Sequence, residues 1–198
     1  MQDIDLQGKR IGFAVTGSFC TLEQAVAAMR ELKNLGAEVL PIASAAVQAT
    51  DSRFGTAAHW REELLIASGA EDIIGSVVAA EPIGPKRLID LLIIAPCTSN
   101  TLAKLAHGVN DDAVTMAAKS HLRNGGPVLI GISTNDGLSN SAANIARLLE
   151  RKQYYFIPFG QDDAAKKPNS LVADFAYLPA AAAAALAGQQ HQPLLIQR

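Results

Sequence analysis

The chain has 198 residues, which is long enough to bury about 70% of its unfolded surface in one domain and excludes a need for disulfides to hold it together. Its 17 Lys and Arg against 19 Asp and Glu give a net charge of -2, which excludes a chain-wide basic field for nucleic acid or an anionic membrane. With 49% hydrophobic and 18% charged residues, the composition excludes disorder and favours a globular protein that binds a small molecule.

Two cysteines, Cys20 and Cys97, each follow an apolar strand-like run and lack the spacing of metal ligands. The chain shows no charged-then-apolar leader, and none of its apolar runs reaches the length of a membrane span. We therefore expect a soluble cytoplasmic protein with free thiols and no metal.

Six apolar runs alternate with helix-like segments, a pattern that indicates a parallel sheet. The run 91–95, Leu-Leu-Ile-Ile-Ala, lacks polar alternation and is typical of a strand covered on both faces. We predict a doubly wound, Rossmann-like α/β fold of about six strands in three α/β/α layers. The predicted strands are Ile11–Thr16, Glu38–Ala43, Ile73–Val78, Leu91–Ala95, Val128–Ile132 and Tyr154–Pro158.

Helices are predicted between these strands. The first covers 21–35, where apolar residues recur at helical spacing and Gly36 is placed to end the helix. Others are expected at 101–106, 111–122 and 139–151.

The remaining segments are less regular. We expect 48–80 to be irregular, and 160–170 to be a polar loop containing Pro168. The whole chain, 1–198, is interpreted as one domain with a tail at 188–198 that is flexible or docks on another surface.

In an open parallel sheet, ligands bind beyond the carboxyl ends of the strands. The turn after the first predicted strand holds Gly17, Ser18 and Phe19, where free amides and the start of a helix favour a phosphate. Ser44, just beyond the second strand, adds a hydroxyl at the same edge. The alternatives are an ordinary Gly-Ser turn with a threonine cap and an ordinary loop serine.

The segment 95–111 carries the most specific motif. An apolar strand runs into a small polar loop and then a helix, with the pattern P-x-T/S-x-N-T-x-A-K-x-A-x-G-x-x-D starting at Pro96 and ending at Asp111. This pattern resembles the signature of the FMN-binding cysteine-decarboxylase-like flavoprotein family. The alternative is that residues 99–101 merely cap a helix.

The resemblance implies a flavoprotein fold and a bound FMN. It places the FMN phosphate at Gly17, Ser18 and Ser44, and the flavin ring and substrate beside the loop 98–100. Asn100 is the residue expected to act in catalysis. The expected cofactor-binding residues are Gly17, Ser18, Phe19, Ser44, Pro96, Cys97, Thr98, Asn100, Thr101 and Ser133.

Two further turns are expected to bind substrate. Asn135 follows the fifth strand, and Lys166 and Lys167 follow the sixth, where two lysines favour a dicarboxylate. Lys86 completes the predicted substrate-binding set. The alternative for the lysine pair is a solvated surface.

These segments also narrow the resemblance, over about residues 8–175, to a branch of the family that forms pyridine-2,6-dicarboxylate during sporulation. It implies a partner chain that binds the nicotinamide cofactor NADP, and a substrate of the dihydrodipicolinate type from the lysine pathway. It also implies that the chain forms a homo-oligomer and acts in the mother cell of a spore-forming bacterium.

One departure from the family concerns mechanism. Decarboxylases of the family carry a histidine before the strand at 91–95, where this chain has Glu-Pro-Ile-Gly-Pro-Lys at 81–86. The four histidines have no catalytic setting: His59 and His107 are assigned to helices, and His121 and His191 to the surface. Three hypotheses remain: one component of an oxidoreductase, a non-catalytic flavin-binding scaffold, and a small FMN-dependent decarboxylase.

Overall fold

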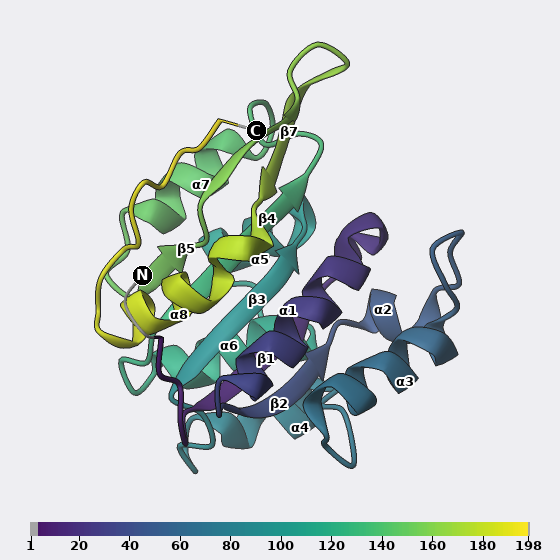
Figure 1. The fold of residues 1–198 in the computed structure, drawn as a ribbon, viewed down its shortest axis with the longest axis vertical. Coiled ribbons are helices and arrows are strands. Elements are labelled where there is room, and N and C mark those ends of the chain that lie inside the picture. Colours follow the sequence, from purple (N-terminus) through teal and green to yellow (C-terminus); the bar gives the residue numbers. More distant parts are fainter. Residues whose placement is uncertain (1–3, 198) are drawn as a thin grey trace.

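A mixed sheet with helices on both faces forms the core of the protein, in a computed structural model that describes residues 4–197 (Figure 1). Within these residues the sheet has seven strands in the order β2-β1-β3-β4-β7-β6, and β5 pairs with β4. The predicted three-layer α/β fold is confirmed. The strands are β1 (Arg10–Val15), β2 (Glu38–Ala43), β3 (Leu91–Cys97), β4 (Val128–Thr134), β5 (Tyr154–Phe156), β6 (Phe159–Asp163) and β7 (Lys167–Ala173).

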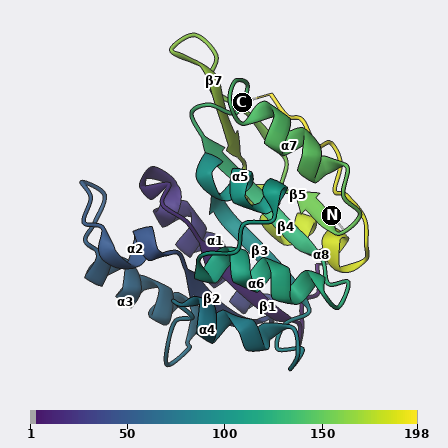
Figure 2. The same cartoon turned by 180° about the vertical axis from the view of Figure 1, so that it is seen from behind.

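The helices divide between the two faces of the sheet. Figure 1 shows α1 and α8 on one face, and Figure 2 shows α5, α6 and α7 on the other. The described helices are α1 (Leu22–Asn34), α2 (Ala45–Ala49), α3 (Ala57–Ser68), α4 (Val77–Ala80), α5 (Ser99–His107), α6 (Ala113–Leu122), α7 (Ala142–Leu149) and α8 (Leu178–Leu186). None of the helices in this part of the chain is long and apolar enough to cross a membrane.

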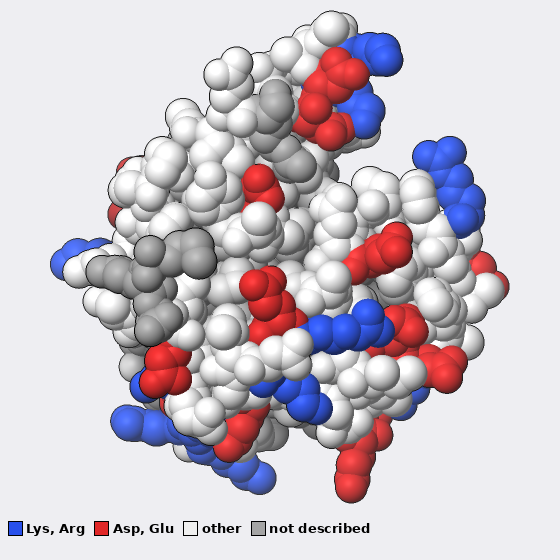
Figure 3. Space-filling view, in the orientation of Figure 1, with Lys and Arg blue, Asp and Glu red and all other residues white. Residues whose placement is uncertain are grey.

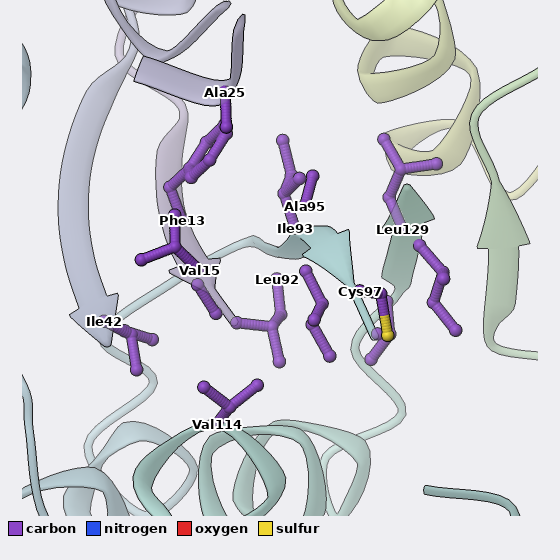
Figure 4. Packing of buried hydrophobic residues seen from close by; sticks show 14 of the residues in the cluster. Phe13, Val15, Ala25, Ile42, Leu92, Ile93, Ala95, Cys97, Val114 and Leu129 are labelled. Atoms are coloured by element: carbon purple, nitrogen blue, oxygen red, sulfur yellow. The ribbon is translucent and has the colours of Figure 1, made fainter. Parts of the chain in front are cut away.

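The central strands are buried along their whole length, because helices cover both of their faces. Every residue of β3 and β4 is buried, as the unbroken apolar run in β3 predicts. Figure 4 shows Phe13 and Val15 of β1 packed beside Leu92 and Ile93 of β3, with Val114 of α6 beneath them. This packing fixes where β1, β3 and β4 end.

The order of the strands places a switch point between β1 and β3. The chain passes from β1 to β2 on one side, and β3 then pairs with the other side of β1 in parallel. The loops after β1 and β3 therefore lead away to opposite sides. Ligands of doubly wound folds bind in the crevice that such a reversal opens.

The predicted strand Ile73–Val78 is wrong. Ile74 makes only an isolated bridge to Ile42 beside β2, and α4 begins at Val77. Ser76 ends the extended segment because its hydroxyl accepts a hydrogen bond from the amide of Ala79 and caps α4. The surrounding segment 48–80, expected to be irregular, holds the twelve-residue helix α3.

The polar loop predicted at 160–170 is also wrong, because this segment forms an antiparallel hairpin from β6 and β7. β7 pairs with the carboxyl half of β4 at Ser133 and Thr134, whereas β5 pairs with its amino half. The outer part of the hairpin is exposed and polar, so it lacks the apolar pattern of a buried strand. Pro168 stands near the start of β7, where a missing N–H is tolerated.

The tail after α8 docks on its own chain. The amide of Phe159 donates to the carbonyl of Leu194, and the amide of Ile196 donates to the carbonyl of Phe159. Leu194 packs against the core, whereas Leu195 is exposed. Arg198 lies outside the described residues.

Candidate functional site

A cleft of about 800 Å³ opens at the carboxyl ends of β1, β3 and β4. The β6–β7 hairpin forms one wall, because β7 runs antiparallel to β4 and its first residues extend past the end of that strand. The loop between α2 and α3 forms the opposite wall, and Figure 3 shows the hollow between these two projections. The lining residues are Gly17, Ser18, Phe19, Cys20, Thr21, Gln24, Ser52, Arg53, Phe54, Thr98, Ser99, Ser133, Thr134, Asn135, Asp162, Lys167, Ser170 and Val172.

A second cavity of about 420 Å³ adjoins this cleft at the switch point between β1 and β3. Gly17 and Thr98 line both cavities, so the two spaces meet at the turns after β1 and β3. The other lining residues of the second cavity are Thr16, Ser44, Ala45, Ala46, Asn100, Thr101, Lys104, Asp111 and Asp112.

Thr16 joins the turns after β1 and β3. Its hydroxyl donates to the carbonyl of Pro96 at 2.7 Å and accepts from the amide of Thr98 at 3.0 Å. Its own amide also donates to the carbonyl of Pro96, which follows a cis peptide bond. Pro96 therefore contributes to the site through its backbone. These bonds hold the Gly17 turn and the Thr98 turn at a fixed separation.

The turn after β1 presents unpaired backbone donors. The amide of Ser18 donates to the carbonyl of Thr16, but the amides of Gly17, Phe19 and Cys20 donate no hydrogen bond within residues 4–197. Gly17 also leaves room beside Ala46, whose Cβ lies 3.3 Å from where a Cβ on Gly17 would stand. The turn thus offers an anion several N–H groups and a close approach to the backbone.

Ser18 belongs to a cluster of hydroxyls inside the larger cleft. Its Oγ lies 2.7 Å from the Oγ of Ser133 at the end of β4, and the hydroxyl of Thr21 donates to the same Ser133 oxygen at 3.1 Å. Ser133 and Thr21 are buried, and Ser18 is half-buried. The structure therefore brings Ser18 and Ser133 together but gives Ser18 a different cavity from Ser44.

Ser44 carries the clearest sign of a missing ligand. It is 5% exposed, and its hydroxyl oxygen is buried with no hydrogen-bond partner among the described residues. Its amide donates to the carbonyl of Val15, which fixes the residue at the carboxyl edge beside Gly17. An unsatisfied buried hydroxyl costs about 1–3 kcal/mol, so a phosphate oxygen that accepted a hydrogen bond from it would recover that cost. The residues around this cavity therefore fit the phosphate of FMN.

Thr98 caps helix α5, and Asn100 does not. The hydroxyl of Thr98 accepts from the amide of Thr101 at 3.4 Å, and the two threonine hydroxyls lie 3.2 Å apart. Asn100 is exposed, lines the second cavity and makes no hydrogen bond with its side chain within residues 4–197. Its amide group is therefore available to a ligand.

One cation and two carboxylates lie beside the second cavity, and the cation pairs with one of the carboxylates. The ammonium of Lys104 lies 2.7 Å from a carboxylate oxygen of Asp111 and lowers the pKa of that carboxyl group. Asp112 accepts hydrogen bonds from the amides of Val114 and Thr115 and so caps α6. The charge of Asp111 is therefore balanced by Lys104, while Asp112 keeps its negative charge and directs one carboxylate oxygen to the first turn of α6.

The two cysteines lie in opposite environments, and both are free thiols. Cys20 is exposed and lines the larger cleft, whereas Cys97 is fully buried at the end of β3 and lines neither cavity. Burial raises the pKa of the Cys97 thiol far above its usual range. Cys97 therefore belongs to the hydrophobic core, at the point where β3 ends and the loop to α5 begins.

The predicted substrate residues separate into three places. Asn135 and Lys167 line the larger cleft, while Lys166 is exposed in the hairpin turn outside that lining. Lys86 lies before β3, next to Arg87, whose carbonyl accepts a hydrogen bond from Arg10 at the start of β1. Lys86 is therefore at the amino end of the sheet, and the structure does not bring it to either cavity.

Sequence reasoning missed the opposite wall of the cleft. Ser52, Arg53 and Phe54 line it from a short loop between α2 and α3. The sequence Asp-Ser-Arg-Phe-Gly contains a turn signal at Gly55, but nothing in it indicates which edge of the sheet the loop approaches. The placement depends on α3 packing against α1 and β2.

Histidines are absent from the linings of both cavities in the described part of the chain. His59 is exposed on α3, and His107 is exposed at the end of α5. The surface assignment of His121 is wrong: its side chain is 5% exposed, and burial lowers its pKa. Among residues 4–197, no group of three or more His, Cys, Asp or Glu side chains is placed to hold a metal ion.

Comparisons with known proteins agree with this geometry. Residues 2–162 match the family described as Flavoprotein. The chain is 48% identical over 192 residues to the dipicolinate synthase B subunit of Bacillus subtilis (strain 168), covering 97% of this chain and 96% of that protein.

Solved structures extend the likeness to the fold. The crystal structure of the dipicolinate synthase B subunit from Bacillus halodurans C matches with a TM-score of 0.90 and 47% identity, covering 98% of this chain and 99% of that one. The FMN-dependent cysteine decarboxylase SpaF matches at a TM-score of 0.68 and 20% identity, over 92% and 99% of the two chains, which shows a shared fold. The chain therefore belongs to the flavoprotein family, and the two dipicolinate synthase proteins are near relatives within it.

Proposed function

We propose that this protein binds FMN with its phosphate at Gly17 and Ser44. The partnerless buried hydroxyl of Ser44 carries the proposal, because Ser44 lines the same cavity as Gly17, whose amide is also unpaired among the described residues. Bound FMN would supply a redox-active ring. Thr98 and Asn100 would orient that ring from the β3 side, and Phe19 and Ser133 border the adjoining cleft.

The proposed reaction is the formation of pyridine-2,6-dicarboxylate from a dihydrodipicolinate-type intermediate, in the mother cell during sporulation. This aromatisation removes a hydride and a proton from the substrate ring, so the hydride needs an acceptor. Asn135 and Lys167 border the space available to the substrate, and Lys167 supplies a positive charge for a carboxylate. The basis for the substrate is the 48% identity to one component of a dipicolinate synthase.

The hydride acceptor is proposed to be NADP on a second chain, the A subunit of dipicolinate synthase. The flavoprotein chain offers one phosphate-type turn, at Gly17, and no G-x-G-x-x-G sequence for a dinucleotide. We further propose that the protein forms a homo-oligomer, as its family does by resemblance. The proposed role is therefore that of one component of an oxidoreductase, without useful activity of its own.

A non-catalytic flavin-binding scaffold is the second candidate. The segment 81–86 lacks the histidine of the decarboxylases, and it enters β3 from the amino end of the sheet, away from both cavities. No residue of 81–86 therefore reaches either cavity of the same chain to act as a general acid. The same observation disfavours the third hypothesis, a small FMN-dependent decarboxylase.

Visible spectroscopy and reconstitution test these proposals in order. Purified protein should be yellow or should bind added FMN, and a colourless protein that gains no flavin spectrum would refute FMN binding. The protein, the A subunit of dipicolinate synthase, NADP and freshly generated substrate are then combined, with one component omitted at a time, while dipicolinate absorbance is followed. Turnover by the flavoprotein alone at the rate of the full mixture would refute the two-component proposal.

Bleaching of the flavin spectrum separates the two main candidates. Addition of substrate and NADP to the complex should change the flavin absorbance if the flavin takes part in electron transfer. A fully active complex whose flavin spectrum stays constant throughout turnover would support the scaffold instead.

A further inference from the structure

The loop 52–55 is built to hold one conformation at the rim of the cleft. Ser52 and Gly55 exchange two backbone hydrogen bonds of 3.0 and 3.1 Å, and the Ser52 hydroxyl accepts from the amide of Phe54 at 3.2 Å. The carboxylate of Asp51 accepts from the amide of Ala57 and ties the loop to the first turn of α3. The tip residues Arg53 and Phe54 are thus presented to the cleft from a braced turn.

Arg53 is a cation without an acidic partner. It is exposed, and within residues 4–197 it makes no ion pair or hydrogen bond with its guanidinium group. Its guanidinium carbon lies 4.8 Å from the centroid of the Phe54 ring, so an aromatic face supports the group. The nitrogen donors at the edge of this group remain available to an acceptor from solvent.

The opposite wall carries a cation in a different state. Lys167 lies 2.5 Å from Asp162, and this contact raises the pKa of the lysine. Arg53 and Lys167 are the two cationic residues among those that line the cleft. An anion that enters the cleft therefore meets one cation that is already paired and one that is not.

From this arrangement we infer that Arg53 binds a carboxylate of the substrate, a small planar dicarboxylate, and that Phe54 packs beside the substrate ring. The inference deepens the proposed function and rests on it. A guanidinium presents two parallel N–H donors that match the two oxygens of a carboxylate. Lys167 on the facing wall can exchange its contact with Asp162 for the second carboxylate, because an exposed ion pair is weak. The chain thereby selects ligands with two carboxylates over ligands with one.

The test is direct binding to the FMN-loaded full chain, measured by calorimetry with two ligands, pyridine-2,6-dicarboxylate and pyridine-2-carboxylate. Arg53→Gln should weaken the dicarboxylate about tenfold or more, because a hydrogen-bonded charge pair is lost. Its preference for the dicarboxylate over the monocarboxylate should fall with it. Arg53→Lys, which keeps the charge but loses the fork, should retain part of the affinity.

Arg123→Gln is the matched control. Arg123 is exposed at the end of α6, lines neither cavity, and its removal changes the net charge by the same amount. Unchanged dicarboxylate affinity in Arg53→Gln, or an equal loss in Arg123→Gln, would overturn the inference. A wild-type chain that binds FMN but no dicarboxylate would also overturn it.

The flavin spectrum of each variant distinguishes a failure of the inference about Arg53 from a failure of the proposed FMN binding. Arg53→Gln should bind FMN as the wild type does, since Arg53 lines the larger cleft and Ser44 the smaller one. A variant that loses FMN instead of the dicarboxylate would assign Arg53 to the cofactor and overturn the inference. Failure of the wild type to bind FMN would overturn the proposed function itself.

Discussion

The two ends of the sheet treat their polar groups differently. At the amino end, Arg10 donates to both carboxylate oxygens of Asp90 and to the carbonyl of Arg87. The amide of Gly84 donates to the hydroxyl of Ser120, which itself donates to the carbonyl of Glu81. These polar groups join loops to a strand and to helix α6. The Nε2 of His121 is an exception at this end, because it is buried without a partner among residues 4–197, but His121 lines neither cavity.

At the carboxyl end, several groups have no protein partner. The hydroxyl of Ser44, the side chain of Asn100 and the guanidinium of Arg53 make no hydrogen bond within residues 4–197. Both ends are built from the same strands, so strand packing alone does not account for the difference. The amino end stabilises the fold, and the carboxyl end is left open to a ligand.

Gly84→Ala should produce the largest effect on stability. An added Cβ would overlap the backbone carbonyl of Ser120, so the loop and α6 must separate. We expect a loss of about 3 kcal/mol, or roughly 6–12 °C in melting temperature, by circular dichroism. Gly17→Ala is the matched change at the other end: its Cβ would stand 3.3 Å from the Cβ of Ala46, a tight contact but not an overlap, so the loss of melting temperature should be well below that of Gly84→Ala while FMN affinity falls. Equal losses of stability would contradict the comparison.

Ser44→Ala should weaken FMN binding without destabilising the free protein. Loss of a hydrogen bond to a charged phosphate costs about 1.5–3 kcal/mol, whereas Ser18→Ala should leave phosphate binding unchanged, because Ser18 contacts Ser133 in the larger cleft. Removal of a partnerless buried hydroxyl should leave the unfolding free energy of the FMN-free protein unchanged or raise it by about 1 kcal/mol. Flavin fluorescence titration and urea unfolding measure the two effects. Unchanged FMN affinity in folded Ser44→Ala would refute the phosphate placement.

Asn100→Asp should reduce activity of the reconstituted complex about tenfold while preserving the melting temperature. Asp cannot donate a side-chain N–H when it is ionised, and the loss of one hydrogen bond corresponds to roughly 1–1.5 kcal/mol. Stability should hold because Thr98, not Asn100, caps α5. Thr98→Ala provides the contrast, with an expected loss of about 1 kcal/mol of stability. A parallel drop in activity and stability in Asn100→Asp would support a structural role.

The parallel strands were predictable because strands buried on both faces consist of unbroken apolar residues, which the sequence shows directly. The unbroken apolar run at 91–95 indicates a strand covered on both faces, and β3 is buried throughout. The β6–β7 hairpin has no such apolar run, since its outer residues Gln161, Asp162 and Lys167 face solvent. The error at 73–78 has the opposite origin: an apolar pattern is present there, because two isoleucines before a serine cap resemble the start of a strand.

The candidate site was predictable on the side that a motif describes. The turns after β1 and β3 meet at Gly17 and Thr98, as expected for loops at one edge of a sheet. Lys86 precedes the predicted strand 91–95, so chain order alone places it at the amino end of the sheet, and its assignment to the substrate was avoidable. The position of Arg53 depends on how α3 packs against α1 and β2, which no local pattern indicates.

The smallest expected effect is the contribution of Asp90 to stability, which should depend on pH. Hydrogen bonds from Arg10 lower the pKa of Asp90 below its ordinary value of 3.8, so its contribution to stability is present above that value and is lost as the pH falls through the lower folded pKa. The side chains of Arg10 and Asp90 are 44% and 34% exposed, so solvent screening limits the contribution to about 1 kcal/mol or less. Asp90→Asn should therefore be less stable than the wild type at pH 7, and the difference should shrink as the pH falls through the lowered pKa of Asp90.

Urea unfolding at stepped pH measures this difference, with Glu71→Gln as a control that removes an exposed carboxylate making no ion pair within residues 4–197. A difference that persists below the folded pKa would show that Asp90 acts through packing rather than charge. FMN affinity supplies the second readout, because Asp90 lies at the amino end and lines neither cavity. If Asp90→Asn weakened FMN binding as strongly as Ser44→Ala, the two ends of the sheet would be energetically coupled, and the division between a structural end and a ligand-binding end would not hold.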